Sequence, residues 1–138
     1  MGLILDTSIL IADERGKFDM AAFLLAFPSP RMLITAITAS ELLHGVERTQ
    51  DPARRIRRQH CVEQVFISLF VQPFDLPQAR VHARIWADLE MRGQMIGAHD
   101  LQIAATGLAN GHDVATLNVK EFQRVPGLNV IDATPFNR

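Results

Sequence analysis

Residues 2–8 read Gly-Leu-Ile-Leu-Asp-Thr-Ser, and this stretch decides the fold expected for the rest of the chain. Four uncharged residues run directly into Asp6, and a helical pattern begins immediately after it. A short apolar run of this kind is typical of a strand buried on both faces at the centre of a parallel sheet. Asp6 would then lie at the carboxyl end of that strand, where open α/β sheets place their ligand crevice. Asp6 is therefore the first candidate for a functional site.

Length and composition predict one globular domain over residues 1–138. The chain is 48% hydrophobic and 21% charged, a balance typical of folded soluble proteins that excludes a disordered or fibrous chain. The N-terminus lacks the features of a signal peptide, and no apolar stretch approaches the roughly 18 residues of a membrane span. Cys61, the single cysteine, excludes a disulfide framework, and we expect it to be a small buried side chain. We therefore expect a cytoplasmic protein with no membrane partner.

The formal net charge of −1 gives no overall attraction to nucleic acid, so RNA binding would need a local basic surface. One candidate surface lies in the first two turns of a predicted helix, away from its apolar stripe. A plain solvent-facing role is the alternative for these side chains. The residues are Arg54, Arg55, Arg57 and Arg58.

Hydrophobic periodicity predicts short strands that alternate with longer helices. Asp51-Pro52 and Asp75-Leu76-Pro77 each combine an N-cap with an early proline and predict helix starts, and Asn110-Gly111 predicts a helix end. Such alternation favours a parallel sheet covered on both faces by helices. The expected strands are 2–5, 32–34, 114–117 and 128–131, with an extended segment at 73–74. The expected helices are about 8–13, 18–27 (stopped by Pro28-Ser29-Pro30), 39–48, 52–70, 76–93 and 101–110.

Acidic and amide side chains follow the predicted strands or open the predicted helices. Those that project toward the same carboxyl edge of the sheet are Asp6, Glu41, Asp100, Asn118 and Glu121. Acids also favour helix N-termini for capping reasons worth about 0.3 to 1 kcal/mol. Thr38-x-x-Glu41 even has the form of a capping box. Each acid taken alone is thus equally well explained by capping.

The joint pattern of acids indicates a metal site. Several carboxylates in one cleft repel one another, and a bound divalent cation removes that cost whereas capping does not. An oxygen-only donor set suits Mg²⁺ or Mn²⁺ and not zinc. Such an ion can activate water, neutralise a phosphate and steady the leaving oxygen. The pattern therefore predicts phosphodiester hydrolysis.

Small residues beside the acids fit this chemistry. Gly45 lies four residues after Glu41 and adjoins it on the helix surface, so no side chain blocks a substrate there. Thr7, Ser8 and Thr116 place hydroxyls near the predicted cleft, where they would orient carboxylates or water. Hydroxyl residues after strands are equally common as caps, so both interpretations stay open.

Four motifs together resemble the PIN domain, most closely the VapC-type toxins of prokaryotic toxin–antitoxin pairs. They occur in the family's order and span nearly the entire chain. The resemblance implies a PIN-like three-layer α/β/α sandwich with a short-stranded, mainly parallel central sheet. The motifs are Leu-Asp-Thr-Ser at 5–8, Thr-Ala-Ser-Glu-Leu-Leu-x-Gly at 38–45, Ala-His-Asp-Leu-x-Ile-Ala-Ala-Thr at 98–106 and Thr-Leu-Asn-x-x-Glu-Phe at 116–122.

The resemblance also implies a Mg²⁺- or Mn²⁺-dependent endoribonuclease that cuts RNA. The family's metal-binding acids fall on Asp6, Glu41 and Asp100. Its fourth acidic position reads Asn118 here, with Glu121 three residues further on. Either Asn118 ligates through its oxygen or Glu121 supplies the missing carboxylate, so a second metal ion stays an open question.

Partners follow from the same resemblance. Family members are usually homodimers, and a small cognate antitoxin neutralises them by laying its C-terminal segment along a hydrophobic groove and inserting a basic residue near the acids. Phenylalanines that would either line such a groove or complete the core, with the core favoured, are Phe18, Phe23, Phe27 and Phe66. Beside an RNA-cutting cleft, the four arginines become candidate phosphate contacts.

Two other functions compete with this prediction. A catalytically inactive PIN module that binds nucleic acid would account for Asn118 and for the nearly neutral charge. A phosphatase or phosphotransferase of the haloacid-dehalogenase type also begins with a strand that ends in Asp, but it needs a second Asp where this chain has Ser8. His99 is not required as a general base if an ion activates the water.

Overall fold

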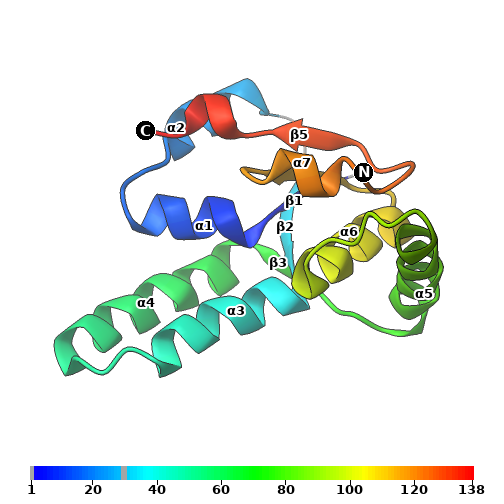
Figure 1. Ribbon diagram of the computed structural model, residues 1–138. Coiled ribbons are helices and arrows are strands. Elements are labelled where there is room, and N and C mark those ends of the chain that lie inside the picture. The colour runs from blue at the N-terminus through cyan, green and yellow to red at the C-terminus, as the bar shows by residue number, and fades with distance from the viewer. Residues whose placement is uncertain (1, 29–30) are drawn as a thin grey trace.

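The computed structural model of the protein describes residues 2–28 and 31–138, and these form a five-stranded parallel sheet surrounded by helices (Figure 1). The strand that begins the chain lies in the middle of the sheet, as the sequence predicts. In spatial order the strands are β3 (Phe70–Gln72), β2 (Arg31–Thr35), β1 (Gly2–Leu5), β4 (Asp113–Thr116) and β5 (Val130–Asp132), and each adjacent pair is parallel.

Helices cover both faces of this sheet (Figure 1). Within the described residues, no helix is long and apolar enough to cross a membrane. In chain order the helices are α1 (Thr7–Glu14), α2 (Met20–Ala26), α3 (Ala36–Glu47), α4 (Pro52–Ser68), α5 (Leu76–Met91), α6 (Ala98–Asn110), α7 (Val119–Phe122) and the short 3-10 helix η1 (Thr134–Phe136).

The alternation of side chains along β1 explains the layers. Leu3 and Leu5 are buried in a core shared with α1, α2 and α4, whereas Ile4 is buried in a second core shared with α5, α6 and α7. Successive side chains of a strand point to opposite faces, so an unbroken apolar strand must be covered twice. Each such side chain stabilises the fold by roughly 1.5–3 kcal/mol. The predicted α/β/α sandwich is confirmed.

Local signals place several helix ends as predicted. The Asp51 side chain accepts a hydrogen bond of 2.9 Å from the Arg54 amide at the start of α4. At the start of α5, Asp75 and Gln78 form a reciprocal capping box. Helix α6 ends at Gly111, which has a φ of 69°, a backbone conformation that glycine adopts without strain.

Strand β3 was predicted in the wrong place, as an extended segment at 73–74. The expected helix 52–70 ends at Ser68, and residues 70–72 form β3, which pairs with the edge of β2. A short apolar run fits either a helix or a strand, and pairing along the sheet decided between them. Two of the residues expected to stop the second helix, Ser29 and Pro30, lie outside the described residues, and α2 itself ends at Ala26.

Cys61 is exposed, so its predicted burial is wrong. Helix α4 packs on the sheet along one narrow stripe, which buries the neighbouring Val62 at 4% exposure and turns Cys61 away from it. The four phenylalanines belong to the core, as favoured. Phe18 and Phe23 are buried, and Phe27 and Phe66 pack against the same cluster.

Candidate active site

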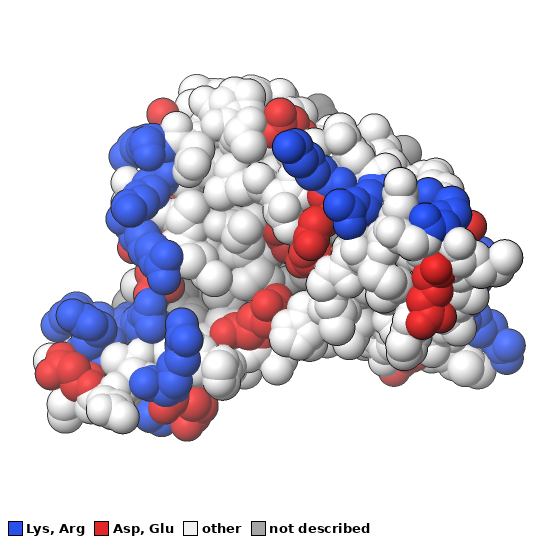
Figure 2. Space-filling model, viewed as in Figure 1, with Lys and Arg blue, Asp and Glu red and all other residues white. Residues whose placement is uncertain are grey.

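The predicted site residues come together at the carboxyl edge of the sheet. Figure 2 shows acidic side chains in the hollowed middle of one face, with basic side chains on both sides. Each site residue follows a strand end or lies in the first turns of a helix: Asp6 after β1, Glu41 in α3, Asp100 in α6, Asn118 after β4 and Glu121 in α7.

Asp6 is the most buried acid of the site, with 3% of its surface exposed. It occupies the N-cap position of α1, but its side chain makes no capping hydrogen bond. Its Oδ2 instead accepts hydrogen bonds of 2.7 Å from the hydroxyls of Ser8 and Thr116. The capping explanation is therefore wrong for Asp6, and its side chain is positioned across the sheet edge.

The backbone fixes the direction of both hydroxyl hydrogen bonds. The Leu117 amide donates to Ser8 Oγ at 3.2 Å, and the Asn118 amide donates to Thr116 Oγ1 at 2.8 Å. Because an amide can only donate, each hydroxyl accepts from the backbone and directs its own proton to Asp6. The predicted orienting role of Ser8 and Thr116 agrees with this geometry.

Burial and charge act against these hydroxyls on Asp6. Burial raises the pKa of Asp6 above its usual range, and the charge of Glu41 raises it further, whereas the hydrogen bonds from Ser8 and Thr116 lower it. The ionised form is thus held by hydroxyl donors in a site that otherwise disfavours it. A cation beside Asp6 would remove that cost.

Glu41 is held from two sides. Thr7 Oγ1 donates a hydrogen bond of 2.7 Å to Glu41 Oε1, and His99 Nδ1 lies 3.2 Å from Glu41 Oε2. Thr7 also lies 2.9 Å from the hydroxyl of buried Thr38. These hydrogen bonds support the interpretation in which Thr7 orients Glu41, which stays a prediction.

The capping box predicted at Thr38 and Glu41 is wrong. Helix α3 begins at Ala36, three residues earlier than expected, and Thr35 caps it by accepting from the Thr38 amide at 3.2 Å. Thr38 therefore lies inside the helix, where its hydroxyl supports Thr7. Glu41 is left without a capping role, one turn inside the helix.

Asn118 joins Asp100 to Glu121. Its amide nitrogen donates to Asp100 Oδ2 at 3.2 Å and to Glu121 Oε2 at 2.8 Å. Burial raises the pKa of Asp100 to about 8, aided by its hydrogen bond to Glu121 and by the charges of Asp6 and Glu121. The pKa of Glu121 is lowered, mainly by its hydrogen bond to Asp100. The two carboxyls therefore titrate together, and the ionised form of Asp100 is the disfavoured one.

The donor chemistry of the site fits a hard divalent cation. Asp6, Glu41 and Asp100 offer carboxylate oxygens, and burial, followed by the charges of neighbouring acids, raises the pKa of both Asp6 and Asp100. In the described part of the chain, no group of three or more His, Cys, Asp or Glu side chains is arranged to hold an ion. The carboxylates are instead turned toward hydroxyl and amide donors.

The four candidate arginines lie on α4, apart from the acids. Arg55 pairs with Glu47 at 3.0 Å, and Arg58 pairs with Glu14 of α1 at 3.0 Å. Among the described residues, no hydrogen bond or ion pair joins these arginines to the acids of the site. Arg58 nevertheless lines the same small hollow as Glu41.

Two residues that lie at the site, His99 and Gly97, were given no role on the basis of the sequence. His99 contacts Glu41 across the gap between α6 and α3, although only its position beside Asp100 hinted at this. The Gly97 amide helps lower the pKa of Glu121, and a Cβ at Gly97 would lie 3.7 Å from Asp100 Oδ2. A glycine immediately before an acid-bearing helix was the available signal.

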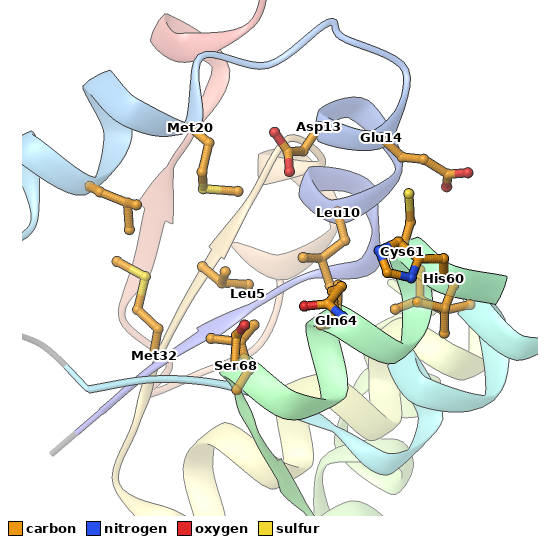
Figure 3. Close-up of a pocket in the computed structure, with 15 residues that line it drawn as sticks. Leu5, Leu10, Asp13, Glu14, Met20, Met32, His60, Cys61, Gln64 and Ser68 are labelled. Atoms are coloured by element: carbon orange, nitrogen blue, oxygen red, sulfur yellow. The ribbon is translucent and has the colours of Figure 1, made fainter. Parts of the chain in front are cut away.

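A separate hollow of about 550 Å³ lies between α4, α1, α2 and the strands β1 and β2 (Figure 3). Its floor is apolar and includes Leu5, Leu10 and Met32, and Met20 points into it from α2. Asp13 and Glu14 of α1 lie along its rim. The hollow therefore combines an apolar floor with an acidic edge.

Comparison with known proteins agrees with the motif resemblance. The family model described as PIN domain matches residues 3–128. The chain is 40% identical to Ribonuclease VapC1 of Rickettsia felis over 131 residues, which cover 95% of this chain and 96% of that protein. It is 34% identical to the tRNA(fMet)-specific endonuclease VapC of Salmonella typhimurium, covering 94% and 96% of the two chains.

Solved structures give the same result. The fold matches VapBC2 from Rickettsia felis bound to a DNA fragment from its promoter with a TM-score of 0.84 and 25% identity, over 94% of this chain and 97% of that chain. DNA-bound VapBC from Salmonella typhimurium matches with a TM-score of 0.82 and 28% identity, over 96% and 98%.

Proposed function

Because this chain belongs to the PIN-domain family, we propose that it is an endoribonuclease that acts as a VapC-type toxin and is neutralised by a cognate antitoxin. Residues 1–138 would form one PIN domain. The relatives named as ribonucleases and the structures of VapBC complexes support this proposal. The observation that carries it is the convergence of Asp6, Glu41 and Asp100 at the carboxyl edge of the sheet.

In this proposal Asp6, Glu41 and Asp100 hold Mg²⁺ or Mn²⁺. When bound, the ion would supply activation of the attacking water and neutralisation of the phosphodiester. The excess of carboxylates and the raised pKa values of Asp6 and Asp100 support this choice of ligands. Because Asp100 carries a proton when its pKa is about 8, loading of the ion at neutral pH would release that proton.

The remaining site residues orient these acids. Ser8 and Thr116 direct Asp6, Thr7 directs Glu41 Oε1, and the Asn118 amide directs both Asp100 and Glu121. Asn118 uses its nitrogen for this, so Glu121 is the better source of the fourth carboxylate. Orientation of this kind reduces the reorganisation that the reaction requires.

The hollow between α4, α1 and α2 is the proposed docking site for the antitoxin. Its apolar floor suits the apolar face of a segment from the partner, and Asp13 on its rim suits a basic residue of that segment, whereas Glu14 already pairs with Arg58 (Figure 3). VapBC complexes among the structural neighbours support a partner of this type. We further propose that the toxin is a homodimer in the cytoplasm.

Hydrolysis of RNA in the presence of Mn²⁺ tests the proposed function. Purified protein is incubated with labelled RNA, and fragments are followed for wild type, for Glu41→Gln and for Glu90→Gln, a control at an exposed position of α5. We expect cleavage by wild type and by Glu90→Gln, and none by Glu41→Gln or in EDTA.

The same experiment addresses the competing function. Absence of cleavage by wild type, or equal cleavage by Glu41→Gln, would contradict the proposal. If RNA were bound under those conditions without being cut, a PIN module that binds nucleic acid without turnover would be the better account.

A further inference from the structure

Two hollows lie in succession beside Glu41, along the hairpin of α3 and α4. The first, of about 70 Å³, is lined by Glu41, Gly45, Arg48 and Arg58 among others. The second, of about 460 Å³, lies at the tip of the hairpin and also includes Arg48 and Arg58, together with Arg54. Arg48 and Arg58 line both hollows, so these two side chains lie between Glu41 and the tip of the hairpin.

The outer hollow is basic, although one of its three arginines, Arg58, is paired with Glu14 of α1. Three of its side chains are the guanidinium groups of Arg48, Arg54 and Arg58. Its one carboxylate, Asp51, is engaged with the Arg54 amide at 2.9 Å. Among the described residues, neither Arg48 nor Arg54 forms an ion pair, and both are exposed. Basic side chains also gather over this end of the molecule in Figure 2.

Arg58 is held in place where the two hollows meet. Its Nε donates to Glu14 at 3.0 Å, and its Nη1 donates to the Gly45 carbonyl at 3.3 Å and to Thr49 Oγ1 at 3.1 Å. The planar guanidinium is thus fixed by groups on α1 and at the end of α3, which lowers the entropy lost when it binds an anion.

Gly45 leaves space in the inner hollow between Glu41 and Arg58. A Cβ at this position would lie 4.0 Å from Arg58 Nη1, and no other neighbouring atom of the described residues lies within 4 Å of it. A larger side chain at position 45 would therefore occupy part of the inner hollow.

We propose that Arg48, Arg54 and Arg58 form a subsite that binds a backbone phosphate of the RNA strand, on the side of Glu41 where Arg58 lies. This proposal rests on the proposed ribonuclease function. An acidic cleft repels the polyanionic strand that it must cut, so the strand needs positive charge beside the acids. A net charge of −1 supplies none globally, whereas this hollow supplies it locally.

The subsite divides the arginines of α4 into two groups. Arg54 and Arg58 line the outer hollow, whereas Arg57, which is also exposed, lines neither hollow. Arg57→Ala removes the same charge from the same helix and is therefore the matched control for Arg54→Ala. Arg58→Lys keeps the charge but loses the fork of hydrogen bonds to Gly45 and Thr49.

The test is the binding of a fluorescent oligouridylate, measured by anisotropy over a series of salt concentrations with EDTA present to prevent cleavage. We expect Arg48→Ala and Arg54→Ala to weaken binding severalfold. The double variant with both changes should lose the phosphate contact and lower the slope of log affinity against log salt by about 0.7, the value of one single-strand phosphate contact. Arg57→Ala should leave the slope unchanged, and Arg58→Lys should weaken binding.

Several results would overturn the subsite. An equal loss with Arg57→Ala would mean a diffuse charge effect, and unchanged binding by Arg48→Ala and Arg54→Ala would exclude the hollow. Displacement of the RNA by an oligoglutamate peptide of equal charge would indicate a surface for acidic protein. Hydrolysis of RNA by wild type with Mn²⁺ is measured separately, so a failure of the nuclease function is distinguishable from a failure of the subsite.

Discussion

The two halves of the acidic site are held in different ways. Asp6 and Glu41 are held by the hydroxyls of Ser8, Thr116 and Thr7, and Asp6 is almost fully buried. Across the site, Asp100 and Glu121 are held by the amide of one exposed residue, Asn118, and the pKa of Asp100 is raised. We call these the hydroxyl-held half and the amide-held half.

The hydroxyl-held half of the site is fixed by the sheet, whereas the amide-held half depends on the protonation of its acids. The hydroxyls of the first half are themselves fixed by backbone amides of Leu117 and Asn118, so the orientation of Asp6 is set by the sheet. In the amide-held half, burial and neighbouring charges raise the pKa of Asp100, so a bound cation would favour its ionised form. We infer that the hydroxyl-held half is organised before metal binding, and that the amide-held half is completed by it.

Removal of a charged oxygen from either half should have the largest effect. Asp6→Asn and Asp100→Asn each conserve size and remove a charge from the proposed metal ligands, so both should lower the rate of RNA cleavage by at least about a hundredfold. The rate of fragment release with Mn²⁺ measures this, and circular dichroism monitors the fold. If only one variant lost activity, the two halves would not form one site.

Loss of a hydroxyl should have the next largest effect. Ser8→Ala and Thr116→Val remove donors that orient Asp6, and such changes typically cost about 10- to 100-fold in metal affinity or activity. The cost should appear in the concentration of Mn²⁺ needed for half-maximal cleavage. If both variants had a lower Tm but needed the same Mn²⁺ concentration for half-maximal cleavage, the two hydroxyls would have only a structural role.

In the amide-held half, the roles of Glu121 and Asn118 can be distinguished by mutation. Glu121→Gln should raise the Mn²⁺ concentration needed for half-maximal cleavage by roughly tenfold, and Asn118→Ala should raise it less, because Asn118 only orients the carboxyls. A titration of activity against Mn²⁺ compares the two variants. A larger effect of Asn118→Ala would instead assign the fourth ligand to the amide oxygen.

The smallest effect concerns the stability of the metal-free protein. Because the pKa of Asp100 is raised from 3.8 to about 8, the folded state binds its proton more tightly than the unfolded chain. The contribution of this proton to the free energy of unfolding is complete below about pH 4. It is lost as the pH rises toward 8. In EDTA, Asp100→Asn should therefore gain a few degrees in Tm over wild type, and the gain should grow with pH.

Calorimetric scans at several pH values measure this difference. The raised pKa of Asp6 acts in the same direction, so Asp6→Asn should show a similar trend. A difference in Tm that stayed constant across the pH range would mean that Asp100 titrates at its ordinary pKa.

Much of the fold and of the site was predictable from the sequence because short-range patterns encode it. The run before Asp6 predicted a central strand, and cap residues such as Asp51 and Asp75 predicted helix starts. The five residues predicted as catalytic lie at one edge of the sheet because parallel strands place their carboxyl ends together, whereas the four predicted arginines lie on α4.

The errors come from contacts that are distant in the sequence. Strand β3 exists because residues 70–72 pair with β2, which no local pattern of α4 reveals. The contact between His99 and Glu41 joins two helices 58 residues apart in the numbering. Cys61 is exposed because α4 packs along a narrow stripe, whereas composition alone favours burial of cysteine.

The central claim is that Asp6 and Asp100, one from each half, hold one divalent cation together. A calorimetric titration with Mn²⁺, in buffers of different ionisation enthalpy so that proton release is also measured, tests it most directly. Wild type and Glu90→Gln should bind Mn²⁺ and release a proton at neutral pH, whereas Asp6→Asn and Asp100→Asn should each lose binding. Mn²⁺ affinity that was unchanged in both Asp variants would contradict the account.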